Sequence, residues 1–163
     1  MKEIFLTSSP FGPLDNSRIV TGIDTMNSFP ENLASRWPDD ARCLVISAFP
    51  TEIDDCDEMR DSMEQSLYDA GFQVACLDIW DDRTQDFSAQ CLMTYDVVFL
   101  GGGHVPTENR FFQAIDLRES LREYEGIVIG ISAGTMNSAN IVYAQPELEG
   151  EATDPTYSRF LYG

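Results

Sequence analysis

The sequence has little positive charge. Ten lysines and arginines stand against 28 aspartates and glutamates, which gives a formal net charge of −18. Because a field of this sign repels phosphate backbones, the composition argues against nucleic acid as a partner. The acids are spread along the chain instead of forming one tail, and this pattern favours a folded protein over a disordered one.

Long apolar runs are missing as well. No stretch reaches the roughly 18 apolar residues that a membrane-spanning helix needs, so the sequence predicts no membrane partner. The first residues, "MKEIFLTSSPFGP", hold one lysine followed directly by an acid, and their apolar stretch is too short for a secretory signal peptide. They indicate a first strand instead.

Cysteine and histidine are also scarce: the chain has four cysteines, one histidine and no C-x-x-C pair. Cys43, Cys56, Cys76 and Cys91 are too scattered for a zinc site or a disulfide framework. Cys43 and Cys76 fall within strand-like runs, where a thiol behaves as a small apolar side chain. This usage predicts a reduced, cytoplasmic setting and no metal site.

What the chain does contain is a recurrent strand-like apolar run. Val97–Leu100 and Ile127–Ile131 are continuously apolar, as in strands that are covered on both faces of a parallel sheet. The predicted strands span residues 3–9, 42–50, 72–80, 95–103 and 126–132.

Helical spacing of apolar residues separates these runs. The most regular helix is predicted over residues 54–70, with Thr51 or Asp54 as its N-cap and Gly71 closing it. Its apolar positions are Met59, Met63, Leu67 and Ala70. A second helix is predicted over residues 109–124, with Phe112, Ile115, Leu117 and Leu121 pointing inward. Shorter helices are predicted around residues 31–36 and 86–93. The first of these lies within residues 10–41, which form the least regular part of the chain.

The alternation of strands and helices predicts one α/β domain over residues 1–163. With right-handed crossovers, such a chain forms a three-layer α/β/α sandwich around a mainly parallel sheet.

Two predicted strand ends carry unusual residues. Gly130-Ile131-Ser132-Ala133-Gly134 is a G-x-S-x-G sequence at the junction of a strand and a helix. A nucleophile elbow has this arrangement, because small neighbours let a serine project from a sharp, strained turn. Gly101-Gly102-Gly103-His104 follows the strand before it, and consecutive glycines leave backbone N–H groups open to a ligand. A glycine-rich turn or a phosphate-binding loop is the alternative for this second segment.

"VVFLGGGHVPTENRFF" followed by "GIVIGISAGTMNSA" resembles the serine peptidases of the dipeptidase E and cyanophycinase type. The resemblance extends over essentially the whole chain in the order of elements. It implies a class I glutamine amidotransferase-like, flavodoxin-like fold. It also implies that Ser132 is the nucleophile, with an oxyanion hole formed by the N–H groups of Gly102 or Gly103 and of Ala133. The implied reaction is hydrolysis of small peptides, such as dipeptides with an acidic N-terminal residue, or of aspartyl–arginine linkages in a storage polymer.

The same resemblance implies an acid and then a histidine base after the serine. Glu147, Glu149 and Glu151 lie in the window of the acid, and the distance to the later Asp-Pro pair favours Glu149. The histidine is expected beyond Gly163. The chain is therefore expected to lack its C-terminal part, which would leave an exposed sheet edge and an apolar patch.

The one histidine in the chain, His104, has three open roles. It is a structural residue, a substrate contact or the catalytic base, and its place beside the oxyanion donors favours substrate contact over the base. Asn109 is a second candidate substrate contact. The arginines that would hold an acidic side chain of a substrate are Arg110, Arg118 and Arg122.

Two classes of function remain open. One is a serine peptidase that acts on a small peptide and needs no metal or organic cofactor. The other is a non-catalytic ligand-binding or inactive amidotransferase-like module with the same pocket. Ammonia production from glutamine is disfavoured, because it needs a cysteine where Ser132 stands. The oligomeric state stays open, a homodimer included.

Overall fold

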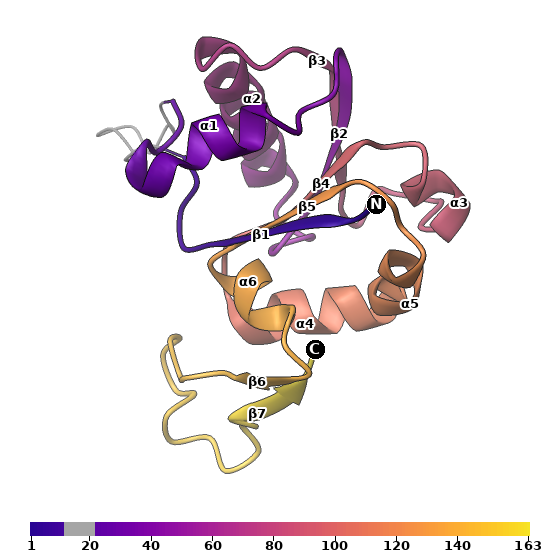
Figure 1. The fold of residues 1–163 in the computed structure, drawn as a ribbon. Helices are drawn as coiled ribbons and strands as arrows, with labels where there is room; N and C mark the ends of the chain where they lie inside the picture. Colours follow the sequence, from indigo (N-terminus) through magenta and orange to yellow (C-terminus); the bar gives the residue numbers. More distant parts are fainter. Residues whose placement is uncertain (12–21) are drawn as a thin grey trace.

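The centre of the protein is a parallel five-stranded sheet in the order β1-β5-β4-β2-β3 (Figure 1). The computed structural model describes residues 1–11 and 22–163. All strand pairings within this sheet are parallel. The strands are β1 Glu3–Thr7, β2 Ala41–Ile46, β3 Val74–Trp80, β4 Val97–Leu100 and β5 Ile127–Ile131. Each lies within the run that predicted it, except that β2 begins one residue earlier, at Ala41.

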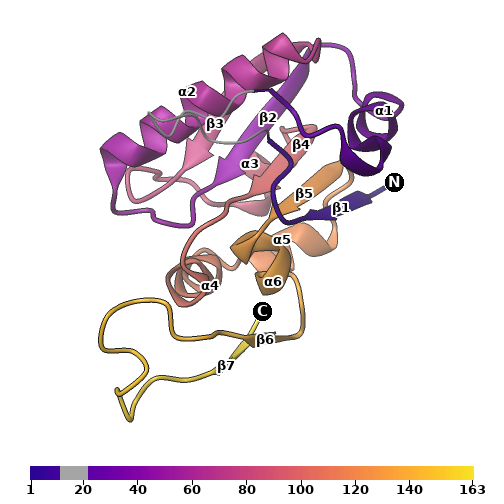
Figure 2. The same cartoon turned by 90° about the vertical axis from the view of Figure 1, so that its left-hand side faces the viewer.

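Helices cover both faces of the sheet, which confirms the predicted three-layer α/β/α sandwich (Figure 2). One face packs against the helices α1 (Phe29–Ala34), which follows the 3₁₀ turn η1 (Met26–Ser28), and α2 (Ile53–Asp69). The other face packs against α3 (Ala89–Leu92), α4 (Val105–Ala114) and α5 (Leu117–Arg122). The irregular stretch predicted over residues 10–41 lies partly outside the described residues.

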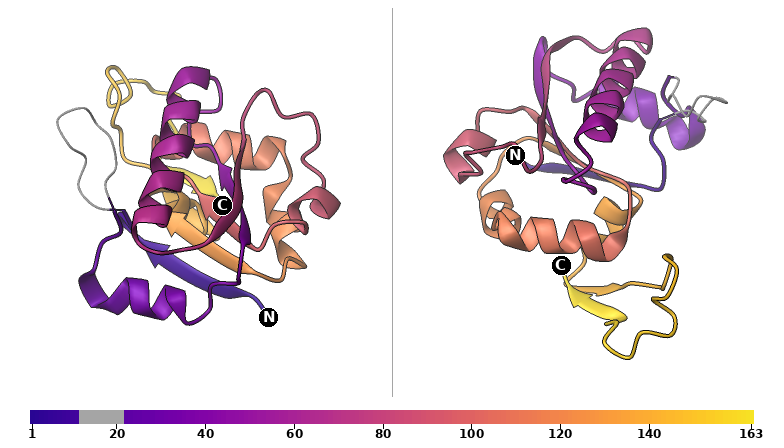
Figure 3. Two further views of the ribbon diagram at one scale, coloured as in Figure 1. Left: turned by 90° about the horizontal axis from the view of Figure 1, so that it is seen from above. Right: turned by 180° about the vertical axis from the view of Figure 1, so that it is seen from behind.

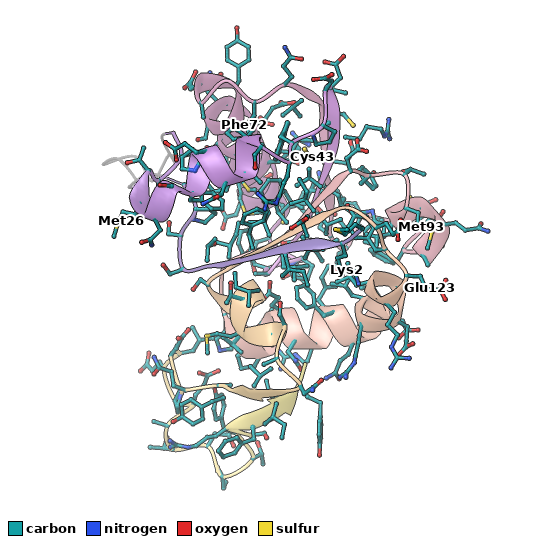
Figure 4. All side chains as sticks on the ribbon, in the orientation of Figure 1. Lys2, Met26, Cys43, Phe72, Met93 and Glu123 are labelled. Atoms are coloured by element: carbon teal, nitrogen blue, oxygen red, sulfur yellow. The ribbon has the colours of Figure 1, made fainter. Side chains whose placement is uncertain are left out.

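Neighbouring residues of each inner strand enter opposite layers of the core. Cys43 and Val45 of β2 pack toward α1 and α2, whereas Leu44 and Ile46 pack toward α3 and α4. This alternation explains why the inner strands are apolar at every position. In Figure 4, Cys43 lies inside the molecule and Met26 at its periphery, in agreement with exposed fractions of 0% and 68%.

Helix α2 confirms the predicted helix but not its caps. Met63 and Leu67 are buried, and the chain leaves the helix through Gly71 at φ 86°, as predicted. The N-cap residue is Glu52, without a side-chain capping bond, so the prediction of Thr51 or Asp54 was wrong. Ala70 is exposed, and it is the C-cap residue that follows α2.

The single helix predicted over residues 109–124 is in fact two helices. Pro106 sits in the first turn of α4, where its missing N–H costs nothing, and the helix begins at Val105. The chain breaks at Asp116, which has a φ of 50° and precedes α5. The four inward positions of the prediction do pack into the core.

The last part of the chain adds a hairpin that the sequence patterns did not predict. Strand β6 (Ile141–Tyr143) pairs antiparallel with β7 (Phe160–Tyr162). Figures 1 and 3 show this hairpin beside α4 and α6 (Ala133–Asn137), outside the main sheet. Val142 and Leu161 face the body of the protein. The opposite face of the hairpin exposes Ile141, Tyr143, Phe160 and Tyr162.

Strand β1 forms one edge of the main sheet, and Ile4 and Leu6 on it are each 58% exposed. A groove of about 620 Å³ lies next to it, lined by residues that include Ile4, Phe112, Leu121 and Tyr162.

Two further findings concern cysteines and membranes. All four cysteines are free thiols, two of them buried. Within residues 1–11 and 22–163, no helix has the length and apolar character that crossing a bilayer requires.

Candidate active site

Ser132 occupies a strained turn between β5 and α6. Its φ of 46° and ψ of −105° lie in a region that residues with a side chain rarely adopt, and such a conformation costs about 1–3 kcal/mol. The turn is held by a hydrogen bond from the Ser132 N–H to the Thr7 carbonyl, 3.0 Å long. The Ser132 side chain is exposed at the carboxyl edge of the sheet. This is the geometry that the G-x-S-x-G sequence predicted.

The two glycines of this motif permit α6 to fold back onto the sheet. A Cβ on Gly134 would lie 2.4 Å from the Leu100 carbonyl oxygen, and one on Gly130 would lie 2.8 Å from Thr135 Oγ1. Both distances are shorter than any non-bonded carbon contact allows. The Gly134 N–H donates to the Gly101 carbonyl at 3.0 Å, which fastens α6 to the glycine loop.

Thr7 and Thr135 brace the turn from the edge strand. Thr135 Oγ1 donates to the Thr7 carbonyl at 2.7 Å and accepts from the Thr7 N–H at 3.1 Å. Thr7 Oγ1 donates to the Gly130 carbonyl at 2.7 Å. These contacts join residues more than a hundred positions apart in the chain, so no local sequence pattern could have indicated them.

The glycine loop, residues 101–103, lies directly against the serine turn. A Cβ on Gly102 would be 3.6 Å from Ser132 Cβ and 3.1 Å from Ile131 Cγ2. A Cβ on Gly103 would be 2.8 Å from Ala48 Cβ, so the loop is also packed on the segment that follows β2. A Cβ on Gly101 would lie 2.8 Å from the Ile46 carbonyl oxygen, so Gly101 and Gly103 leave no room for a side chain and Gly102 leaves little.

This loop lies at the topological switch point of the sheet, between β2 and β4. The chain runs from β2 to β3 on one side of β2 and then crosses over to β4 on the other side. In open parallel sheets, ligands bind outside the carboxyl ends of the strands at such a point. The Gly101 N–H donates to the Ile46 carbonyl at 3.0 Å, which closes the gap between the two strand ends.

Backbone N–H groups beside Ser132 are free to meet a ligand. In the described part of the chain, no residue accepts a hydrogen bond from the N–H of Gly102 or Gly103. Ala133 is the first residue of α6, where no preceding helical carbonyl is available to its N–H. The three predicted oxyanion donors therefore have no partners of their own, and of the two loop candidates Gly102 is the one that lies against Ser132.

His104 follows the loop and is held by two side chains. Its Nδ1 lies 2.8 Å from Thr107 Oγ1, and its Nε2 lies 2.9 Å from Glu151 Oε1. The Glu151 oxygen is off the direction in which a ring N–H points, so this second contact is electrostatic more than a hydrogen bond. With both nitrogens facing these partners, His104 can accept a proton from Ser132 only if its ring turns away.

Glu151, and not Glu149, is the acid in contact with the histidine. Glu149 is exposed, and its carboxylate forms no hydrogen bond or ion pair with a described residue, so the structure does not bring it to the site. The N–H groups of Leu148 and Glu147 donate to Glu151 Oε2, and these bonds, together with His104, hold the pKa of Glu151 below its usual range. The number of residues before the Asp-Pro pair favours Glu149, but the turn at residues 147–151 points Glu151 inward instead.

Asn109 is not brought to the site either. It is 3% exposed, and its side-chain N–H groups donate to Asn137 Oδ1 at 3.1 Å and to the Tyr162 carbonyl at 2.8 Å. Its Oδ1 accepts from Gln113 at 2.9 Å. Asn109 therefore links α4 to α6 and to the hairpin, and it has no atom left for a substrate.

Of the three candidate arginines, one lies near the glycine loop and two lie away from it. Arg110 lies on α4 near the glycine loop, and its guanidinium is 3.3 Å from Thr107 Oγ1. Arg118 donates to the Gly163 carbonyl and to Asn140, and Arg122 pairs with Glu119. Both belong to α5, which leads into the amino end of β5 and so lies away from the edge that holds Ser132.

Among the described residues, no group of three or more histidine, cysteine, aspartate or glutamate side chains is placed to hold a metal ion. No protein-family model matches the chain, and no curated protein matches it significantly. The fold and the site together define an α/β three-layer sandwich with a strained serine turn packed on a glycine loop at the carboxyl edge of its sheet.

Proposed function

We propose that this protein is a serine hydrolase of the acyl-transfer type, similar to the dipeptidase E and cyanophycinase peptidases. One observation carries the proposal: Ser132, at a φ of 46°, lies directly against a glycine loop in which the N–H groups of Gly102 and Gly103 have no partner in the described part of the chain. A serine turn alone occurs in many folds. A serine turn beside free backbone donors is what acyl transfer requires.

In the proposed reaction, Ser132 Oγ attacks the carbonyl carbon of a peptide bond. A C–O bond forms, the carbonyl electron pair moves onto oxygen, and the Oγ proton passes to a general base. The N–H groups of Ala133 and of Gly102 or Gly103 would stabilise the oxyanion, each by on the order of 3 kcal/mol. Collapse then breaks the C–N bond, the amine leaves with a proton, and water hydrolyses the acyl-enzyme. The base is a histidine by resemblance to the family.

A small peptide with an acidic N-terminal residue is the substrate that we propose. Arg110 is the best placed of the three candidate arginines, because it lies on α4, which begins just after the glycine loop, and no described carboxylate pairs with it. A fixed cation at this place favours a carboxylate on the substrate. We place the reaction in the cytoplasm, as the free cysteines favour.

A ligand-binding module is the second candidate. It is favoured by the fact that no described side chain forms a hydrogen bond with Ser132 Oγ, so the serine has no base in contact. Free N–H groups at a strand end would then hold a carboxylate or another anion without a reaction.

Labelling with a fluorophosphonate separates the two candidates. In this reaction the serine oxygen attacks phosphorus, the P–F bond breaks and fluoride leaves. Peptide mapping by mass spectrometry should locate one phosphonyl group per chain, on Ser132. Ser138 is the matched control, since it is also exposed and lies six residues further along, with its Oγ bonded to the Gly134 carbonyl. Labelling spread evenly over Ser132 and Ser138, or no labelling of either, would favour the binding module.

A further inference from the structure

A carboxyl group is buried beneath the candidate active site. Glu108 of α4 is 0% exposed. Its Oε2 accepts a hydrogen bond of 2.8 Å from Asn137 Nδ2, while its Oε1 has no partner among the described residues. Burial raises the pKa of Glu108 to about 8, and the bond from Asn137 works in the opposite direction. Glu108 is therefore largely a neutral carboxylic acid at pH 7.

The partner of Glu108 belongs to the helix that begins at the serine turn. Asn137 is the last residue of α6, and α6 begins directly after Ser132. Besides its bond to Glu108, Asn137 Nδ2 donates to the Val105 carbonyl in the first turn of α4, at 3.2 Å. Asn137 Oδ1 accepts from Asn109, also on α4. One buried amide thus ties the end of α6 to the beginning of α4.

These two helices carry the two halves of the site. Helix α4 begins one residue after the glycine loop, with His104 as its N-cap, and α6 begins with Ala133. The distance between Ser132 and the glycine loop therefore depends on how closely α4 and α6 pack. The hydrogen bond from Asn137 to Glu108 links α6 to α4 through their side chains, and Glu108 is its ionisable partner.

We propose that Glu108, acting through Asn137, is a positioning residue that holds the Ser132 turn against the glycine loop, and that it does so as a neutral acid. This inference rests on the proposed hydrolase function. Ionisation would place a carboxylate in a site without a compensating cation, where it needs more water and more hydrogen bonds than Asn137 supplies. Helix α6 would then separate from α4, and the oxyanion donors would move away from Ser132.

No described cation is placed to neutralise such a charge. Helix α6 has no titratable side chain, and β7 has only Tyr162. The charged and titratable groups of the other elements around α4 have partners of their own. They are His104 with Glu151, Arg110 with Thr107, Arg118 with Asn140 and Gly163, and Arg122 with Glu119.

The pH dependence has a definite sign. The folded protein holds a proton on Glu108 up to its raised pKa of about 8, whereas the unfolded chain releases the proton near the ordinary glutamate pKa of 4.5. Stability therefore falls as the pH rises through this window and levels off above the folded pKa. Reactivity at Ser132 should fall over the upper part of the same range, as the neutral acid is lost.

Glu108→Gln is the direct test. Glutamine keeps an oxygen that can accept the bond from Asn137, places an amide where Oε1 stands and cannot ionise. The rate of phosphonylation of Ser132 is measured from pH 6 to pH 10 for the parent and the variant. The ratio of the parent rate to the variant rate should fall about tenfold between pH 7 and pH 9, as a single group with this pKa loses its proton. Taking the ratio removes the pH dependence of the serine and of the reagent.

Glu123→Gln is the matched control, because Glu123 is exposed at the end of α5, at the periphery in Figure 4. Its ratio to the parent should be independent of pH. If Glu108→Gln gives an equally flat ratio while Ser132 is still labelled, the positioning role is wrong and the hydrolase proposal stands. If Ser132 is not labelled in the parent at any pH, the hydrolase proposal itself fails, and this inference with it.

A measurement on the parent keeps the proposal testable if Glu108→Gln does not fold. Carbon-13 NMR of the protein labelled at the glutamate carboxyl carbon should show one resonance that titrates near pH 8. Titration of every glutamate below pH 6 would overturn the proposal.

Discussion

Ser132→Ala is expected to abolish the burst of p-nitrophenolate that the parent releases from p-nitrophenyl acetate. This ester has a good leaving group, so acylation depends on the nucleophile and the oxyanion donors and needs no general acid. Removing the nucleophile leaves only the residual catalysis of the donors. The rate of acylation should therefore fall by at least about a hundredfold, and the acetylated peptide should disappear from the mass spectrum.

Ser138→Ala is the control for this experiment. Ser138 follows α6 and is exposed, and its Oγ donates only to the Gly134 carbonyl in the described part of the chain, so loss of the hydroxyl should leave the burst within about twofold of the parent. A burst that survives Ser132→Ala at the parent rate would place the nucleophile elsewhere and contradict the proposed function.

Gly134→Ala is expected to have the largest effect on stability. The added Cβ would lie 2.4 Å from the Leu100 carbonyl oxygen and 2.7 Å from Leu100 Cβ. The first neighbour is backbone in the buried strand β4, so it cannot move without disturbing the sheet. Overpacking of this kind typically costs 1–3 kcal/mol, and against a fixed strand we expect at least about 3 kcal/mol of unfolding free energy. Urea unfolding, followed by circular dichroism, measures the loss.

The same substitution should separate the two halves of the site. Gly134 donates to Gly101, and a methyl group inserted here pushes α6 away from the glycine loop. Labelling of Ser132 should fall even under conditions in which the variant is fully folded. Gly150→Ala is the control: Gly150 has a φ of 91° but open space around it, so only about 1 kcal/mol of backbone strain is expected. Equal losses for the two variants would contradict the close packing of α6 on β4.

The sheet and its layers could be predicted because their signal is local and repeated. Val97–Leu100 is apolar at every position, since this strand is buried on both faces, and the same holds for the strand before Ser132. The break at Asp116 could not be predicted, because an aspartate in a left-handed conformation leaves no glycine or proline in the sequence to mark it. The hairpin β6–β7 could not be predicted either, because its strands have three residues each, too few for an alternating pattern of apolar and polar residues.

In the candidate site, too, the residues with a local sequence signal could be predicted and those that depend on distant contacts could not. Ser132 and the glycine loop carry residue types that a strained turn and a close backbone approach demand, so the sequence alone indicated both. The contact of His104 with Glu151 and that of the buried Glu108 with Asn137 join residues far apart in the chain. Glu108 in particular looks like an ordinary helix residue beside Asn109, and its importance appears only when α6 is seen to cover it.

The proposed function depends on Ser132 lying beside backbone N–H groups that have no partner. A crystal structure of the phosphonylated protein tests this most directly. The phosphoryl oxygen should lie about 2.7–3.1 Å from the nitrogen of Ala133 and from that of Gly102 or Gly103. A phosphoryl oxygen that points into solvent, with the glycine loop turned away from it, would contradict the account.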